Sequence, residues 1–292
     1  MYPYFEIAAR SVQGYTHVRQ GQNNQDAFVW GTLDNGPGYE IDDETNTKSL
    51  ERTAIAIVCD GCGSCPASEV GAQLGARFLV DAIAQRLHHG DSVSDQAFWS
   101  DVQADVLQRL RSLTTSLNGN EVKAIQAYLL FTIMGAVIAP EATVIFGLGD
   151  GVFAINDEVQ STGPFVDNAP PYLAYQLMPE GHTPFTPGEL ELTIHRQVPT
   201  PEVRSLLIGS DGVEDLRAIE SSPLPGKTEL VGHLSQFWLS DRYFKNPDTV
   251  RRRLALINRE SIKPDWQQQQ LAKQGGLLPD DTTLVVMRRS ES

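Results

Sequence analysis

The sequence has 292 residues, of which 41% are hydrophobic and 21% are charged, and this is the balance of an ordinary soluble globular protein. Its formal net charge of -14 disfavours binding to nucleic acid or anionic lipid, so we expect neither nucleic acid nor a membrane among its partners. No apolar stretch approaches the roughly 20 residues of a membrane helix, and residues 1–6 lack a basic region followed by an apolar segment, which predicts a cytoplasmic protein.

Runs of apolar and β-branched residues predict the strands. In chain order, these runs cover residues 27–33, 54–59, 128–139, 143–148, 152–156, 190–195, 205–209 and 283–287. Pro140 and Asn156 fall between neighbouring runs as turn signals. The short connections favour antiparallel hairpins over a parallel sheet.

Two long helices are predicted after the second strand. The first has Gly71 and Gly75 beside an apolar stripe at helical spacing, formed by Val70, Leu74, Phe78, Ile83 and Leu87. The second has its own stripe, formed by Phe98, Val102, Val106 and Leu110. Two further helices are expected, over residues 228–239 and 249–272. The small glycine residues would allow the first helix to pack closely.

The order of these elements predicts an α+β fold, a four-layer α-β-β-α sandwich of two antiparallel sheets covered by helix pairs. We expect a single domain over residues 1–292, because the residues that form the candidate site span most of the chain. A proline-rich stretch at residues 157–188 shows little periodicity, so it is predicted to be a loop near the substrate entrance.

Four aspartates indicate a metal site. Asp26, Asp60, Asp211 and Asp280 each occur in a tight setting of small residues at the end of an apolar run. Carboxylates that converge from several strands repel one another unless divalent cations neutralise them. Glycine after a strand lets the backbone approach a cation closely, as at Gly61. Hard oxygen ligands select Mg²⁺ or Mn²⁺ over zinc.

The three cysteines offer an alternative interpretation. Cys59, Cys62 and Cys65 form a C-x2-C-x2-C run, whose spacing is typical of zinc or iron-sulfur ligands, so a Cys-ligated zinc or iron-sulfur protein stays open as a second hypothesis. Against it, the chain has no fourth cysteine, and Cys59 ends an apolar strand where a free thiol behaves as a small core residue. An odd, clustered set also argues against disulfides.

The order of these motifs resembles the metal-dependent serine/threonine protein phosphatases of type 2C, the PPM family, in a bacterial-type variant. The resemblance lies in five pieces spread over nearly the whole chain: residues 24–27 (Asn-Gln-Asp-Ala), 60–63 (Asp-Gly-Cys-Gly), 147–150 (Gly-Leu-Gly-Asp), 210–215 (Ser-Asp-Gly-Val-Glu-Asp) and 280–286 (Asp-Asp-Thr-Thr-Leu-Val-Val). The family has an α-β-β-α sandwich fold, which agrees with the fold predicted from the elements.

The resemblance implies a phosphatase that hydrolyses phosphoserine and phosphothreonine in proteins, with a water molecule bridging two Mn²⁺ or Mg²⁺ ions. It gives Asp26, Asp60 and Asp211 catalytic roles. The metal ligands that it implies are Asp60, the carbonyl of Gly61, Asp211, Asp280 and Asp26. A phosphorylated protein is the expected partner.

The sequence also departs from the family pattern. Gly21 stands where family members place a phosphate-binding arginine, so Arg19 or His17 is expected to bind the phosphate instead. Gln25 replaces a carboxylate. These two changes leave open another interpretation, in which a weakly active or inactive module of the same fold binds phosphoproteins.

Overall fold

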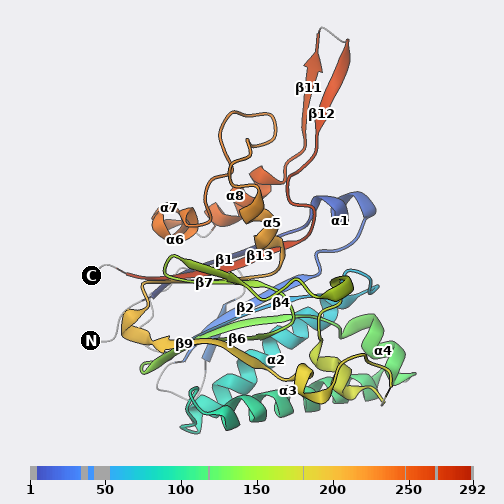
Figure 1. Ribbon diagram of the computed structural model, residues 1–292, viewed down its shortest axis with the longest axis vertical. Helices are drawn as coiled ribbons and strands as arrows, with labels where there is room; N and C mark the ends of the chain where they lie inside the picture. The colour runs from blue at the N-terminus through green and yellow to red at the C-terminus, as the bar shows by residue number, and fades with distance from the viewer. Residues whose placement is uncertain are drawn as a thin grey trace.

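The computed structural model describes residues 5–33, 39–42, 53–117, 119–179, 181–246, 248–266 and 269–290. Its strands form two larger antiparallel sheets and one separate hairpin (Figure 1). The five-stranded sheet has the order β1 (Phe5–Val12), β13 (Thr282–Arg289), β10 (Ser205–Gly209), β7 (Val152–Ile155), β8 (Glu158–Ser161). The six-stranded sheet has the order β3 (Tyr39–Asp42), β2 (Asp26–Leu33), β4 (Thr53–Asp60), β5 (Ile133–Ile138), β6 (Ala142–Leu148), β9 (Thr193–Pro199).

The two sheets pack face to face. Alternate residues along each strand point to opposite faces, and the inner faces of both sheets contribute to one buried apolar cluster. Val58 and Met134 enter this cluster from the six-stranded sheet, and Ile208 and Met287 enter it from the five-stranded sheet. This shared core fixes the edges of the two sheets relative to each other.

Helices cover both outer faces. The long helices α2 (Ser68–His88) and α3 (Gln96–Ser116) pack with α4 (Glu121–Tyr128) on the six-stranded sheet through a second apolar cluster (Figure 1). A third cluster joins the five-stranded sheet to α5 (Gly212–Ala218), α6 (Gln236–Leu239), α7 (Arg242–Lys245) and α8 (Asp248–Ile257). The layers therefore run helix, sheet, sheet, helix, and the predicted α+β four-layer sandwich is confirmed.

Helix α2 buries its predicted apolar stripe only in part: Ile83 is fully buried, and Phe78 and Leu87 are half-buried against the same cluster. Val70 is 42% exposed, whereas Ala72, Ala76 and Leu79 are fully buried. Along its first turns, the helix lies too close to the segment between α4 and β5 to carry large side chains there. A Cβ atom added at Gly71 would overlap the carbonyl of Tyr128, and one at Gly75 would overlap the Phe131 ring. Small residues thus select the buried face there, and the close packing predicted from the glycines is confirmed.

Several predicted boundaries were wrong. The run 128–139 is a strand only over β5, because its first residue ends α4. The strand predicted at 190–195 is shifted to β9, after a short 3-10 helix, η3 (Pro187–Leu190). The helix predicted over 228–239 is reduced to α6. The one predicted over 249–272 ends with α8 and is followed by a hairpin of β11 (Ser261–Asp265) and β12 (Gln270–Gln274).

Other elements have no counterpart among the predicted ones. They are β1, β3, β8, α4, α5, α7, the short helix α1 (Tyr15–Gln20), and the 3-10 helices η1 (Val166–Asn168), η2 (Leu173–Leu177) and η4 (Thr200–Glu202). The loop predicted at 157–188 contains β8, η1, η2 and the start of η3. Within the described part of the chain, no helix combines the length and the apolar character that crossing a membrane requires.

Candidate functional site

Two strand ends place two carboxylates side by side. Strand β4 ends at Asp60, and its antiparallel neighbour β2 begins at Asp26, so these two residues are direct partners in the register. Asp26 is buried and Asp60 is half-buried. The apolar run before Asp60 packs inside the sandwich, and this packing carries the carboxylate to the edge of the six-stranded sheet.

The second sheet brings two more carboxylates to the same edge. Strand β10 ends one residue before Ser210, and Asp211 is the N-cap residue of α5, while Asp280 precedes β13. The hydroxyl of Ser210 donates a hydrogen bond to Asp26 Oδ2 over 2.7 Å, and it accepts one from the Thr283 backbone N–H over 3.1 Å. Ser210 therefore ties the edges of the two sheets together.

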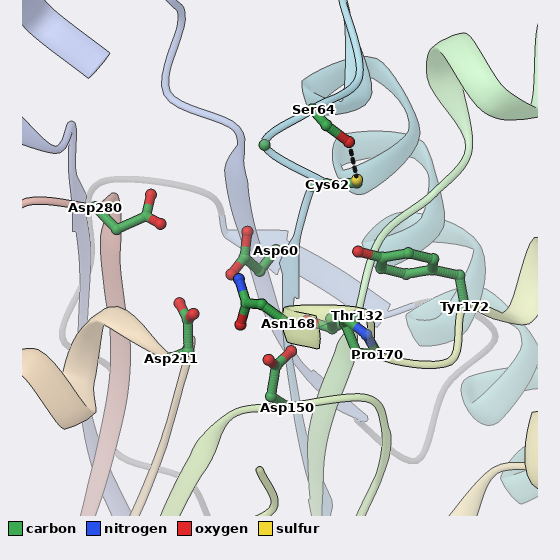
Figure 2. A pocket seen from close by; sticks show the side chains of 12 residues that line it. Asp60, Cys62, Ser64, Thr132, Asp150, Asn168, Pro170, Tyr172, Asp211 and Asp280 are labelled. Atoms are coloured by element: carbon green, nitrogen blue, oxygen red, sulfur yellow. Dashed lines mark hydrogen bonds between the residues drawn. The ribbon is translucent and has the colours of Figure 1, made fainter. Parts of the chain in front are cut away.

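These carboxylates surround a cavity of about 290 Å³ (Figure 2). In the figure, Asp60, Asp150, Asp211 and Asp280 extend toward its centre from different parts of the chain. The lining residues are Asp60, Gly61, Cys62, Gly63, Ser64, Thr132, Asp150, Asn168, Pro170, Tyr172, Asp211 and Asp280. Asp26 lies behind this lining, in contact with Ser210.

Burial and mutual repulsion raise the pKa values of three carboxyl groups at the site, so these groups are protonated more readily than free aspartate. Burial, followed by the charge of Asp281, raises the pKa of Asp26 to about 7. Burial, followed by the charges of Asp280 and Asp150, raises the pKa of Asp211 to about 6. For Asp60, burial and the charges of Asp26, Asp211 and Asp280 raise the pKa well above its ordinary range. Positive charge in the cavity would release these protons.

The donor set fits a hard divalent cation. The buried oxygens Asp26 Oδ1 and Asp211 Oδ1 have no hydrogen-bond partner, which is costly for a carboxylate away from water. A Cβ at Gly61 would come within 2.9 Å of the Gln25 carbonyl, so only glycine fits where this backbone lines the cavity. All the ligands available from these residues are oxygens, which is the set that Mg²⁺ and Mn²⁺ prefer.

Gln25 has a donor role that a carboxylate does not fill. Its Nε2 donates to Ser68 Oγ over 2.7 Å and to the carbonyl oxygens of Cys62 and Cys65, each over 3.3 Å. Glutamate in this position would have no proton to donate and would face two carbonyl oxygens. The amide therefore fixes the loop between β4 and α2, which includes Gly61.

Asp281 holds two other segments of the chain beside the cavity. It is 2% exposed, and its two carboxylate oxygens accept backbone N–H groups of Gly14 over 2.7 Å and of Gln25 over 2.5 Å. His17 lies between Asp281 and Asp280, with Nδ1 3.0 Å from Asp281 Oδ1 and Nε2 3.5 Å from Asp280 Oδ1. His17, Asp280 and Asp281 form the one cluster of potential metal-ligating side chains found in the described ranges, with ligand atoms within 4.8 Å.

The predicted phosphate-binding residues lie outside the cavity lining. The guanidinium of Arg19 lies 5.6 Å from the centre of the Tyr15 ring, and its side chain is exposed on α1. His17 is the buried residue of α1 and contacts Asp280, but it is not part of the cavity lining. No lysine or arginine is among the described residues that line the cavity.

Asp150, Asn168 and Tyr172 line the cavity but were not predicted as site residues. The Gly-Asp-Gly sequence at 149–151 joins β6 in one sheet to β7 in the other, so it is a crossover and not a hairpin turn. Gly149 has a φ of 92° there, a backbone conformation that favours glycine. Asp150 could be found from its motif. Asn168 and Tyr172 lie in the loop predicted at 157–188, and only the three-dimensional course of that loop brings them to the cavity.

The cysteines do not form a common ligand site. Cys59 is fully buried in the apolar cluster under α2, while Cys62 lines the cavity with its Sγ 3.2 Å from Ser64 Oγ. No cysteine belongs to a metal-ligating cluster in the part of the chain that the structure describes. The Cys-ligated zinc or iron-sulfur hypothesis is therefore not supported, because one thiol is held in the core. Hydrogen bonding from Cys65 lowers the pKa of Cys62 to about 5.

The chain belongs to the protein phosphatase 2C family, whose model matches residues 13–254. It is therefore a serine/threonine protein phosphatase by class, as the motifs predicted. Among curated proteins, none is similar enough in sequence to count as a match.

Solved bacterial phosphatases share the fold. PppA, a regulatory component of T6SS in Pseudomonas aeruginosa, is 14% identical with a TM-score of 0.50, and the match covers 99% of each chain. A variant of a bacterial serine phosphatase is 14% identical with a TM-score of 0.50, over 99% of this chain and 100% of the other. The catalytic domain of PstP, solved with two manganese ions, is 17% identical with a TM-score of 0.48, over 99% of each chain.

Proposed function

We propose that the protein hydrolyses phosphoserine and phosphothreonine in proteins, using two Mn²⁺ or Mg²⁺ ions bound in the cavity. The observation that carries this proposal is the convergence of Asp60, Asp211 and Asp280, from both sheets, on one cavity with no lysine or arginine in its described lining. When bound, the cations would supply the positive charge that neutralises the phosphate and would make a water molecule acidic enough to serve as the nucleophile.

The residues of the chain divide this work. Asp60, Asp211, Asp280 and the carbonyl of Gly61 would hold the cations, and Asp26 would hold water from the second layer, where Ser210 fixes its orientation. Asn168 faces the cavity and offers N–H donors for phosphate oxygens, while the single O–H of Tyr172 is engaged with Cys62 at the cavity wall (Figure 2). Burial and a hydrogen bond with Cys62 raise the pKa of Tyr172, so its hydroxyl keeps its proton at neutral pH.

The test is hydrolysis of p-nitrophenyl phosphate and of a panel of phosphoserine, phosphothreonine and phosphotyrosine peptides. We expect EDTA to abolish turnover, manganese to restore it, and Asp60→Ala to eliminate it while the protein stays folded by circular dichroism. Full activity of Asp60→Ala would refute the mechanism.

A second candidate function is a phosphoprotein-binding module with little or no turnover. It is favoured by the absence of lysine and arginine from the described lining of the cavity, where they would bind the phosphate. Calorimetry distinguishes the two functions, since a binding module would take up manganese and phosphopeptide but release no phosphate over hours.

A further inference from the structure

His17 lies beside the candidate site without lining its cavity. It is 9% exposed and is the buried residue of α1, whereas its helix neighbours Thr16, Val18 and Arg19 are exposed. Burying a polar side chain is unfavourable unless the side chain has partners. The contacts of the imidazole ring are therefore the guide to what it does.

Each ring nitrogen of His17 faces a carboxylate. Nδ1 lies 3.0 Å from Asp281 Oδ1, and Nε2 lies 3.5 Å from Asp280 Oδ1. Nδ1 is out of line for a hydrogen bond, so its contact with Asp281 is electrostatic. The ring thus spans two consecutive carboxylates, of which Asp280 lines the cavity and Asp281 does not.

Helix α1 is fixed to the segment that carries these carboxylates. The backbone N–H groups of Tyr15 and Thr16 donate to the carbonyl oxygens of Leu278 and Pro279, over 2.8 and 3.0 Å. These two bonds hold the first turn of the helix against the chain just before the paired carboxylates. The position of the His17 ring therefore follows from the backbone.

The start of α1 also packs tightly against the carboxylate pair. A Cβ atom at Gly14 would come within 2.4 Å of the backbone carbonyl carbon of Asp280. On the other side of the ring, Asp281 is held by the N–H groups of Gly14 and Gln25. The imidazole is thus confined between a fixed helix and a fixed carboxylate, and it stays beside Asp280.

The Asp280 carboxylate gains its orientation from these neighbours. Its side chain is 50% exposed, and fixing an exposed side chain toward a cation costs conformational entropy. Its Oδ1 accepts the N–H of Asp281 over 2.7 Å and faces His17 Nε2. Oδ2 is thereby the oxygen that remains for the cavity, toward which the side chain extends in Figure 2.

The orientation of Asp280 matters to the whole site. Burial is the larger cause, but the charge of Asp280 also raises the pKa values of Asp60, Asp150, Asp211 and Asp215. A group that fixes Asp280 therefore also fixes part of the field that a cation meets in the cavity.

We propose that His17 is a positioning residue of the metal centre: from outside the cavity lining, its Nε2 holds Asp280 Oδ1, so that Asp280 Oδ2 is aimed at the cation. His17 acts through Asp280 and does not contact the phosphate. It therefore sets how tightly the cation is bound. This inference rests on the proposed function for the presence of the cations.

Two amide substitutions separate the roles of the two ring nitrogens. Glutamine places its amide nitrogen about as far along the side chain as Nε2, and asparagine places its own about as far as Nδ1. His17→Gln therefore keeps a donor for Asp280, whereas His17→Asn reaches only Asp281. We expect His17→Asn to weaken manganese binding about 10–100-fold, and His17→Gln to weaken it by less than about threefold.

His233 provides the matched control. Like His17 it faces a carboxylate, with Nε2 3.7 Å from Glu220 Oε2, but it is exposed and lies outside the cavity lining. His233→Asn should leave manganese binding unchanged. The electron paramagnetic resonance signal of free Mn²⁺ measures binding during a titration of metal-stripped protein, with no substrate present. Urea unfolding of the same samples shows whether each variant is folded.

Three outcomes would overturn the proposal. Equal manganese affinity in His17→Asn and the unaltered protein would show that the ring does not position a ligand. An equal loss in both His17 variants would exclude the specific role of Nε2. A raised KM for p-nitrophenyl phosphate with unchanged manganese affinity would assign His17 to the phosphate. Manganese binding that depends on His17 as expected, without any phosphopeptide hydrolysis by the unaltered protein, would support the positioning role and contradict the phosphatase function alone.

Nuclear magnetic resonance of the unaltered protein covers the case in which a variant does not fold. Because Mg²⁺ is diamagnetic, the ring nitrogen signals of His17 can be followed while Mg²⁺ is added. We expect the Nε2 signal of His17 to shift as Asp280 takes up the cation, while the signals of His233 stay fixed. A His17 ring whose signals do not move at saturating Mg²⁺ would also overturn the proposal.

Discussion

Asp26 and Asp60 are direct partners across the antiparallel β2–β4 pair, so the six-stranded sheet ends in two facing carboxylates. Like charges opposite each other in a sheet are destabilising, and here burial adds to the repulsion. The fold tolerates this arrangement through Ser210, whose hydroxyl donates to Asp26 from the other sheet. The Asp26 and Asp60 carboxylates thus repel each other in the metal-free protein, and a bound cation would reduce this repulsion.

Asp211→Asn should make the metal-free protein more stable and should lower its activity. The difference between a pKa of about 6 in the folded protein and the ordinary 3.8 corresponds to roughly 3 kcal/mol of destabilisation at alkaline pH, which the neutral amide removes. We expect metal-free Asp211→Asn to unfold at higher urea concentration than the unaltered protein at pH 8, while hydrolysis falls by more than about 100-fold. Asp81→Asn, which loses only the ion pair with Arg109 on the helices, should show neither change.

The stability of the metal-free protein should fall as pH rises from about 5 to about 8. The folded-state pKa values of Asp26 and Asp211, about 7 and about 6, lie above the unfolded value of 3.8, so the folded state binds more protons in this window. The two protonated carboxyl groups contribute fully to the free energy of unfolding below pH 3.8, and this contribution is lost as the pH rises through 6 to 7. Thermal unfolding in EDTA at a series of pH values measures the loss. Asp26→Asn should reduce the slope, and a melting temperature that rises with pH would contradict the assignment.

Gln25→Glu should destabilise the protein by about 2–3 kcal/mol and lower its activity. The carboxylate cannot donate to Ser68 Oγ or to the two cysteine carbonyls, and it adds charge beside Asp26. Urea unfolding measures the loss. Gln103→Glu is the matched control, since Gln103 accepts the Leu192 N–H through Oε1 and glutamate keeps an acceptor there. A stable and more active Gln25→Glu would show that the position is a metal-ligand position occupied by an amide.

Gly75→Ala should destabilise the protein by about 1–3 kcal/mol, because the added methyl group would overlap the Phe131 ring. Phe131 is paired with Gly61 by an isolated β-bridge, so activity should fall together with stability. Urea unfolding and p-nitrophenyl phosphate hydrolysis measure both effects. Gly188→Ala, where a Cβ meets no atom within 4 Å, should leave both unchanged.

The sequence predicted the elements whose local pattern and final environment agree. The run before Asp60 is apolar throughout because both of its faces are buried, and the Asp-Gly that follows marks its end at the site. Periodicity was less reliable for α2, because the close approach of the Tyr128 backbone and the Phe131 ring requires glycine at positions 71 and 75. The β11–β12 hairpin was predicted as helix because its glutamine-rich stretch favours helix locally.

The rest of the site depends on contacts that no local pattern encodes. Ser210 was part of a recognised motif, yet its bond to Asp26 exists only because two sheets pack together. Asn168 reaches the cavity through a loop whose path follows from neighbouring packing, with a φ of 51° at that residue. The donor role of Gln25 depends on where the loop between β4 and α2 lies, which no local pattern shows. From the sequence alone, Gln25 was therefore interpreted as the replacement of a carboxylate.

Strand β13 lies between β1 and β10, and these two strands pair with it and not with each other. Strand β1 therefore cannot join its sheet until residues 282–289 are in place, and the same segment brings Asp280 to the cavity. Such long-range pairing is slow to form. A chain without residues 280–289 would lack both the strand that joins β1 to its sheet and a carboxylate that lines the cavity.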